Sequence, residues 1–160
     1  GTVPARSSLQ FSLTCSIVGV NGLATGVTSM TSVIISTNQP PLPGEYDVSP
    51  RNGFEITDKF AFSAKLWVDI DLPLSYSFSF ISPTEPKGTQ YITIRTEQTR
   101  VQSALPAGLD FESFAITTVL FVFDSLNSKS QASIDLTVKK LNASGQQIGT
   151  ATLSVNFLEF

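Results

Sequence analysis

The sequence predicts an all-β protein, specifically an antiparallel β-sandwich, on three observations. Helical periodicity is nearly absent from the chain. Short runs alternate apolar or aromatic residues with serine and threonine, which is the period-two pattern of half-buried strands. Glycine, proline and asparagine separate these runs, as they do in sandwich folds. With 160 residues, the chain is long enough to form one such domain with its own core.

Two strands are predicted before the first proline-rich break. Leu9 to Ile17 alternates along its length, Asn21-Gly22 marks a turn, and Thr31 to Thr37 is rich in β-branched residues. Pro40 to Gly44 then interrupts the pattern, because proline lacks a backbone N–H and does not fit a central strand. The break predicts a boundary between two units or a crossover between two sheets. We therefore expect residues 1–41 to be strands of a preceding sandwich or extra strands of the main one.

A second series of alternating runs predicts the main sandwich over residues 46–141. In the most regular run, Leu74 to Phe80, aromatic and apolar residues share one face. We expect the serines of the other face to be solvated or to form a contact face for an adjoining module or subunit. Residues 142–160 are interpreted as a C-terminal strand or the start of a next module. The other predicted strands are Phe60 to Trp67, Tyr91 to Arg95, Phe114 to Phe123, Ala132 to Val138 and Ala151 to Phe157.

Four of the larger apolar residues are expected to share one core, because the period-two pattern places them on inward faces: Trp67, Tyr76, Phe78 and Val119. Arg51-Asn52-Gly53 is predicted to be a turn in which Gly53 supplies a positive φ.

The composition excludes several classes of function. The chain has no histidine, which removes Ser-His-Asp and Cys-His catalytic groups and every histidine metal site. Its single cysteine, Cys15, excludes an intrachain disulfide and is predicted to be a buried, inert thiol. A net charge of -3 offers no basic surface for nucleic acid, and no apolar run is long enough to span a membrane. We predict that the chain is not an enzyme and has no cofactor.

The motifs of the chain occur in a distinctive order, and together they resemble a known family. The proline-rich stretch is followed by these runs: Tyr46 to Gly53, Phe60 to Ala64, Trp67 to Phe78, Leu105 to Gly108 and Thr118 to Ser125. Over Val33 to Val138, this order resembles the REJ (receptor for egg jelly) region of polycystin-type cell-surface proteins. The resemblance implies an immunoglobulin-like, fibronectin-III-like sandwich. It also implies that the family's paired cysteines fall on Tyr46 and Ala64, so that packing has to replace this disulfide.

In a fold of that kind, loops at one pole would bring together Asp69, Asp71 and Asp124, which are therefore the calcium candidates. On an extended strand Asp69 and Asp71 would lie about 6.5–7 Å apart, which is wide for two ligands of one ion. Aspartate commonly hydrogen-bonds the backbone of its own loop, and we predict that role here, with no ordered metal. Asn142 begins an Asn-x-Ser sequon and is the candidate glycosylation site.

The resemblance implies a non-catalytic extracellular module of a larger cell-surface glycoprotein, on ciliary or gamete membranes among others. Such a module would act as a spacer or as an element of adhesion or mechanosensing, with neighbouring modules or other surface proteins as partners. One alternative is a structural subunit of a surface filament or appendage, because low charge and pairable terminal strands suit self-association. The other is a carbohydrate-binding accessory module, which needs an exposed aromatic platform.

Overall fold

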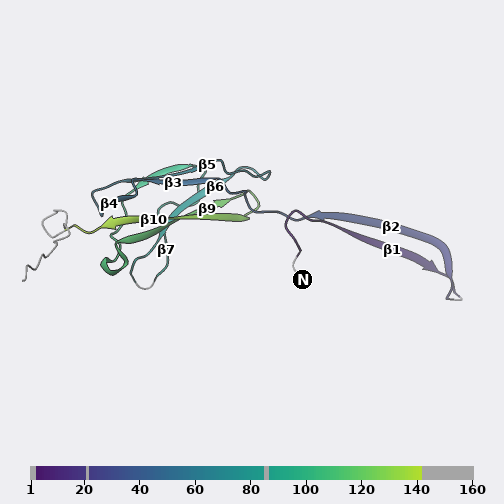
Figure 1. Cartoon of the computed structure of the whole chain (residues 1–160). Helices are drawn as coiled ribbons and strands as arrows, with labels where there is room; N and C mark the ends of the chain where they lie inside the picture. Colours follow the sequence, from purple (N-terminus) through teal and green to yellow (C-terminus); the bar gives the residue numbers. More distant parts are fainter. Residues whose placement is uncertain (1–2, 21, 85–86, 142–160) are drawn as a thin grey trace, which may run out of the picture. The chain divides into compact units, whose positions relative to one another are not determined.

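The computed structural model describes residues 3–20, 22–84 and 87–141 (Figure 1). The chain divides into two compact units, Gly1–Pro40 and Pro41–Phe160. The first unit is a β-hairpin in which β1 (Ser8–Val18) pairs antiparallel with β2 (Ala24–Ser36). Thr37 closes its base, because the backbone N–H of Ser7 donates to Thr37 Oγ1 at 2.8 Å. The predicted turn is present where Gly22 adopts a φ of 77°.

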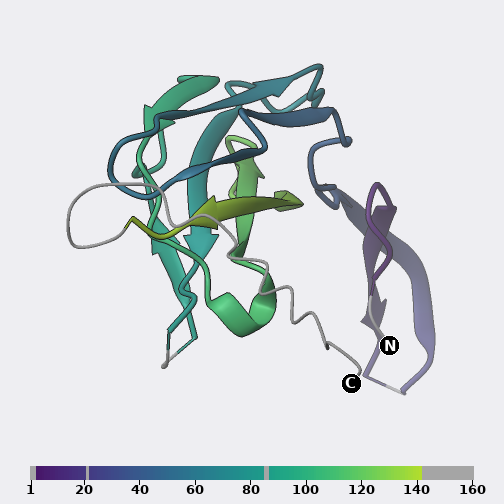
Figure 2. The same cartoon turned by 60° about the vertical axis from the view of Figure 1, so that its left-hand side comes forward.

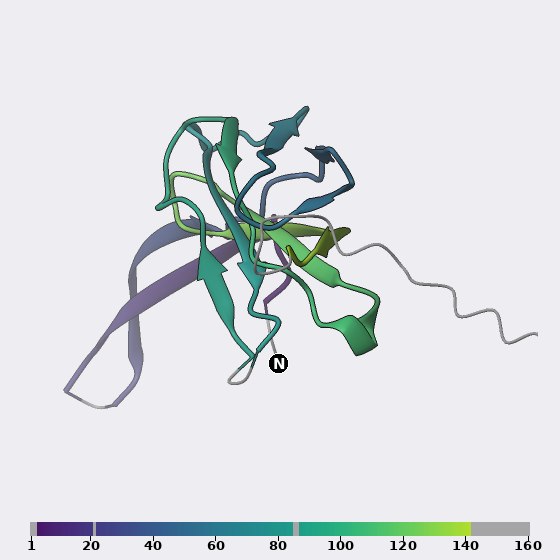
Figure 3. The same ribbon diagram turned by 90° about the vertical axis from the view of Figure 1, so that its left-hand side faces the viewer.

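The second unit is an antiparallel β-sandwich, which confirms the predicted all-β class. Its two layers are seen from different sides in Figures 2 and 3. One sheet has the order β3-β5-β8 and the other the order β4-β10-β9-β6-β7, with β4 and β10 as the parallel pair. The strands of the first sheet are β3 (Glu45–Ser49), β5 (Phe60–Lys65) and β8 (Arg100–Ser103). Those of the second are β4 (Asn52–Phe54), β6 (Ser75–Ile81), β7 (Thr89–Tyr91), β9 (Ala115–Phe123) and β10 (Lys129–Lys139).

The helical content of the described residues is one 3₁₀ turn, Asp110–Glu112. No helix in the described part of the chain is long and apolar enough to cross a membrane.

The core lies between the two sheets and is built from alternate residues of their strands. Trp67, Tyr76 and Phe78 all belong to it, as predicted. Trp67 lies just beyond the end of β5, where its indole N–H donates to the Glu45 carbonyl at 3.3 Å. Val119 is also buried, but it lies outside this core cluster, so its predicted place there is wrong. Its register partner is Ser79, which puts both residues on the outer face of the sheet.

The serine face of β6 is buried, which contradicts the prediction that it is solvated. Ser79 is fully buried and Ser77 nearly so, and their hydroxyls donate to the carbonyls of Val119 and Thr93, each at 2.9 Å. The Ser77 hydroxyl therefore bonds to the segment after β7, and the Ser79 hydroxyl bonds to β9. The predicted strand Tyr91 to Arg95 ends at Tyr91, and the following residues stay beside β6, where Thr96 forms an antiparallel bridge with Tyr76.

Two further expectations are corrected by the structure. Gly53 lies within β4, not in a turn, and its φ is not positive. A Cβ at Gly53 would lie 2.8 Å from Phe60 Cζ and 2.9 Å from Asp58 Oδ2, so close packing is what requires glycine at this position. Cys15 is exposed on the hairpin, whereas the sequence context predicted a buried thiol.

Candidate functional site

The three aspartates singled out from the sequence meet at one pole of the sandwich. Asp69 and Asp71 lie in the bend between β5 and β6, and Asp124 directly follows β9. Their carboxylate oxygens lie within 4.8 Å of one another. The wider spacing expected for an extended strand does not apply, because the chain bends and the Asp71 N–H donates to Asp69 Oδ1 at 3.0 Å.

Asp124 organises the turn between β9 and β10. Its carboxyl group is fully buried, and Oδ1 accepts the backbone N–H groups of Leu126 at 2.9 Å and Ser128 at 2.8 Å. The Ser125 N–H donates to the Asp71 carbonyl at 3.0 Å, which joins this turn to the bend after β5. Calcium prefers six to eight oxygen ligands. Oδ1 of Asp124 already accepts two backbone N–H groups, so this oxygen has little capacity left to bind such an ion.

Arg95, in the segment after β7, contacts the same pole. Its guanidinium donates to the Asp124 carbonyl at 2.7 Å and to the side chain of Asn127, and it lies 4.6 Å from the centroid of the Phe123 ring. Sequence reasoning missed this residue, because a single arginine at the end of a predicted strand carries no spacing signal. The pole is therefore a hydrogen-bonded joint between three loops. Asn142, the glycosylation candidate, lies outside the described residues.

The positions where the family's cysteines fall are direct neighbours in the structure. Tyr46 on β3 is the register partner of Ala64 on β5, and the Tyr46 ring packs against Phe78 with 6.4 Å between ring centroids. The Ala64 N–H donates to the Thr99 carbonyl on the far side of β5. The two residues therefore form a non-hydrogen-bonded pair, the kind in which side chains lie closest together. A large and a small side chain thus fill the place of the disulfide.

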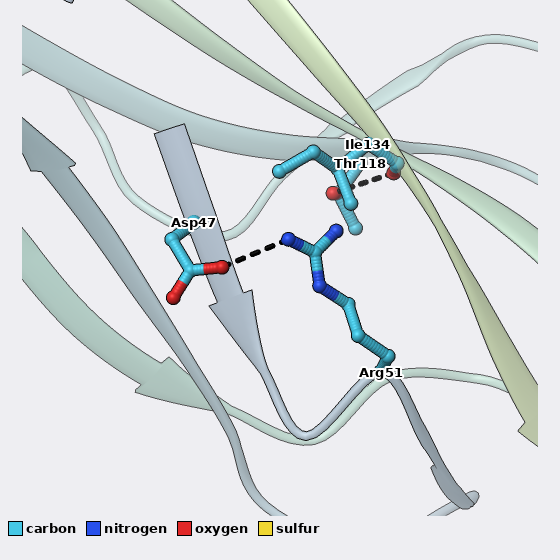
Figure 4. A network of polar contacts seen from close by, with 4 residues as sticks. All are labelled: Asp47, Arg51, Thr118 and Ile134. Atoms are coloured by element: carbon cyan, nitrogen blue, oxygen red, sulfur yellow. Dashed lines mark hydrogen bonds and ion pairs between the residues drawn. The ribbon is translucent and has the colours of Figure 1, made fainter. Parts of the chain in front are cut away.

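Burial raises the pKa of the Tyr46 phenol to about 12, and the nearby Thr118 hydroxyl and Arg51 guanidinium oppose this rise. Figure 4 shows what those two groups contact. Arg51 pairs with Asp47 at 2.8 Å, and Thr118 Oγ1 donates to the Ile134 carbonyl at 2.9 Å. Among the described residues, Tyr46 Oη has no partner that meets the geometry of a hydrogen bond. The phenol is therefore a buried donor that favours its neutral form.

An aromatic row crosses the outer face of the larger sheet. Tyr91 on β7 is 64% exposed, its ring centroid lies 6.4 Å from that of Phe121 on β9, and Phe121 lies 6.5 Å from Phe123. The Lys129 ammonium lies 5.2 Å from the Phe121 ring centroid. Sequence reasoning did not find this row, because it depends on β7 and β9 both pairing with β6.

The family model of the REJ domain matches residues 1–159 of the chain. The match is wider than the resemblance over Val33 to Val138 and includes the hairpin of the first unit. No curated protein sequence matches the chain.

Proposed function

Because the chain belongs to the REJ domain family, we propose that it is a spacer in the extracellular part of a polycystin-type surface protein, where it supports adhesion or mechanosensing. REJ domains are generally non-catalytic extracellular modules. The proposed location includes ciliary membranes, and the proposed partners are neighbouring modules and other surface proteins.

The path of the chain through the sandwich supports this role. The chain enters the second unit at Pro41, whose carbonyl accepts the Ser130 hydroxyl at 2.6 Å beside the start of β10. β10 ends at Lys139. Ser130 and Lys139 are nine positions apart along the strand, which amounts to about 30 Å. The point of entry and the end of β10 therefore lie at opposite poles of the unit (Figure 1), which suits an element arranged in series with others.

The strands near the two ends of this unit are arranged to resist such a pull. β4 runs parallel to β10, with Asn52 opposite Thr137 and Phe54 opposite Lys139. Tension between Pro41 and the end of β10 therefore acts along these two strands in opposite senses. The hydrogen bonds between them lie across the strands, so they are strained together and not one after another.

Single-molecule force spectroscopy tests the proposal. In a Cys15→Ser background, handles attached through Leu42→Cys and Leu141→Cys pull along the strands. Handles attached through Leu42→Cys and Leu126→Cys pull at one pole, because Leu126 lies in the turn that precedes Ser130. We expect a clearly higher unfolding force for the first pair. Equal forces for the two geometries would contradict a role in transmitting tension.

The aromatic row favours a carbohydrate-binding module as the second candidate function. Tyr91 offers an exposed ring next to Phe121 on the outer sheet surface, and the Lys129 ammonium lies over the Phe121 ring. A glycan screen of the full chain tests this candidate, with Tyr91→Ala as the variant and Tyr46→Phe as the control, because Tyr46 belongs to the other side of the sheet. Binding that is lost in the first and kept in the second supports it.

A further inference from the structure

The strand β8 lies at one edge of the smaller sheet and pairs with β5 alone in that sheet. The Ala64 N–H donates to the Thr99 carbonyl at 2.9 Å, which sets the phase of the ladder between the two strands. Hydrogen-bonded and non-hydrogen-bonded pairs alternate along an antiparallel ladder. Arg100 and Gln102 therefore belong to non-hydrogen-bonded pairs, and their backbone N–H and C=O groups point away from β5 to the free edge.

The side chains of Arg100 and Gln102 lie on the outer face of the sheet, because Val101 between them packs against the core. Their register partners on β5 are small, which leaves a shallow hollow across this face. The hollow is lined in part by Ala61, Ser63, Lys65, Arg100 and Gln102. The free edge thus combines unpaired main-chain groups with polar side chains beside a hollow.

Charge is distributed unevenly across this outer face. The cations Lys65 and Arg100 belong to β5 and β8, whereas the acidic residues Glu45 and Asp47 belong to β3, the opposite edge strand. Asp47 is paired with Arg51 at 2.8 Å, but Lys65 and Arg100 form no ion pair with any described residue. The free edge of β8 is therefore the cationic side of this face, in a chain with a net charge of -3.

We infer that an extended acidic peptide adds to β8 as a further strand of the smaller sheet. The main chain of the peptide pairs with the free N–H and C=O groups of Arg100 and Gln102. Residues directly opposite each other share a face, so an acidic residue opposite Arg100 lies beside the guanidinium on the outer face. The next residue lies opposite the half-buried Val101 and favours an apolar side chain. The peptide therefore alternates acidic and apolar residues.

The charge of the edge decides which strands bind. Charged side chains on an edge strand discourage pairing with uncharged strands. A carboxylate opposite Arg100 compensates the guanidinium, whereas a basic strand is repelled by both Arg100 and Lys65. The interaction does not depend on the proposed spacer role, and its failure would leave that role untouched.

Fluorescence anisotropy of a labelled peptide tests the inference on the full chain. The probe is about eight residues long and alternates glutamate and valine; reductant is present because Cys15 is exposed. We expect saturable binding, and clearly weaker binding when every glutamate of the peptide is glutamine. Arg100→Gln should weaken binding about fivefold, the usual size of a cross-strand ion pair. The matched control is Arg6→Gln, which removes the same charge from the first unit and should bind normally. Fluorescence of Trp67 checks that the sandwich is folded in both variants.

Methylation of the peptide backbone tests strand addition separately from charge. In the inferred pairing, the N–H groups of the glutamates point toward β8 and those of the valines point away. N-methylation of the glutamates should therefore abolish binding, and N-methylation of the valines should preserve it. The two peptides carry the same charge and the same side chains, so they differ only in the edge that is blocked.

Each of four outcomes would overturn the inference. The peptide could fail to bind at millimolar concentration, or the glutamate and glutamine peptides could bind equally well. Arg6→Gln could weaken binding as much as Arg100→Gln. Equal binding of the two methylated peptides would show that the hollow takes carboxylate side chains without adding a strand.

Discussion

A disulfide built into the Tyr46–Ala64 pair should form and stabilise the sandwich. The two residues are register partners in a non-hydrogen-bonded antiparallel pair, where Cα atoms lie about 4.5 Å apart, within the range that disulfides require. The variant carries Tyr46→Cys and Ala64→Cys in a Cys15→Ser background, which leaves no other thiol. The bond would close a loop of about 19 residues, for which chain entropy predicts about 3 kcal/mol of stabilisation.

The oxidised and reduced forms of this variant have to be compared with each other, not with the natural chain. Replacing Tyr46 removes a ring that packs against Phe78, and truncations of this size cost about 3–5 kcal/mol. The gain from the crosslink and the loss of packing are therefore of similar size. Both forms of the double variant share the lost ring, so the difference between them isolates the crosslink.

Urea unfolding with and without reductant measures that difference. The control variant keeps Tyr46→Cys and moves the second cysteine by one residue, to Ser63→Cys. Successive side chains of a strand point to opposite faces, so this pair is not able to bridge. The expected result is a difference near 3 kcal/mol for the first variant and none for the second. Equal stability of its oxidised and reduced forms, or crosslinking of the control, would refute the register assigned here.

Three other predictions concern single side chains. Trp67→Ala should lower the free energy of unfolding by about 3–5 kcal/mol in urea, because the indole is buried; an unchanged value would place Trp67 outside the core. The raised pKa of Tyr46, about 12, means that its neutral phenol stabilises the fold below pH ~10 and that this contribution is lost between pH ~10 and pH ~12. Between pH 8 and pH 11, the free energy of unfolding measured in urea should fall by about 1 kcal/mol more in the natural chain than in Tyr46→Phe. An equal fall in both proteins would contradict the raised pKa of Tyr46. Millimolar calcium should not raise the melting temperature; a rise that Asp69→Asn abolishes would make the aspartate pole a calcium site.

Local pattern was sufficient to predict the strands that alternate regularly. The run Leu74 to Phe80 lies within β6 apart from its first residue, and Ala132 to Val138 lies within β10, because a strand with one buried face has to alternate. A very short strand cannot be predicted in this way, because it shows no alternation. β4 has only three residues, and the sequence around Gly53 predicts a turn instead. Gly53 is constrained by the close approach of Phe60 from a different strand, and the residues next to Gly53 in the sequence do not indicate this contact.

The candidate site was less predictable, because its geometry depends on contacts between distant segments. The approach of Asp124 to Asp69 and Asp71 followed from the expected meeting of loops at one pole. The bend that brings their oxygens within 4.8 Å could not be read from an alternating triplet. The Ser77 hydroxyl bonds to the Thr93 carbonyl in the segment after β7, and no periodicity predicts that this segment stays beside β6.

The aspartate pole and the path of the chain are connected. Asp124 shapes the turn that begins β10, and Ser130, six residues later, holds the Pro41 carbonyl where the chain enters the sandwich. The hydrogen bonds of Asp124 therefore belong to the pole at which tension from the preceding unit would arrive. A buried carboxylate that satisfies two backbone amides of one turn is a rigid support. If the module is the spacer proposed above, the cluster would stiffen the pole that receives the load, and this role requires no metal ion.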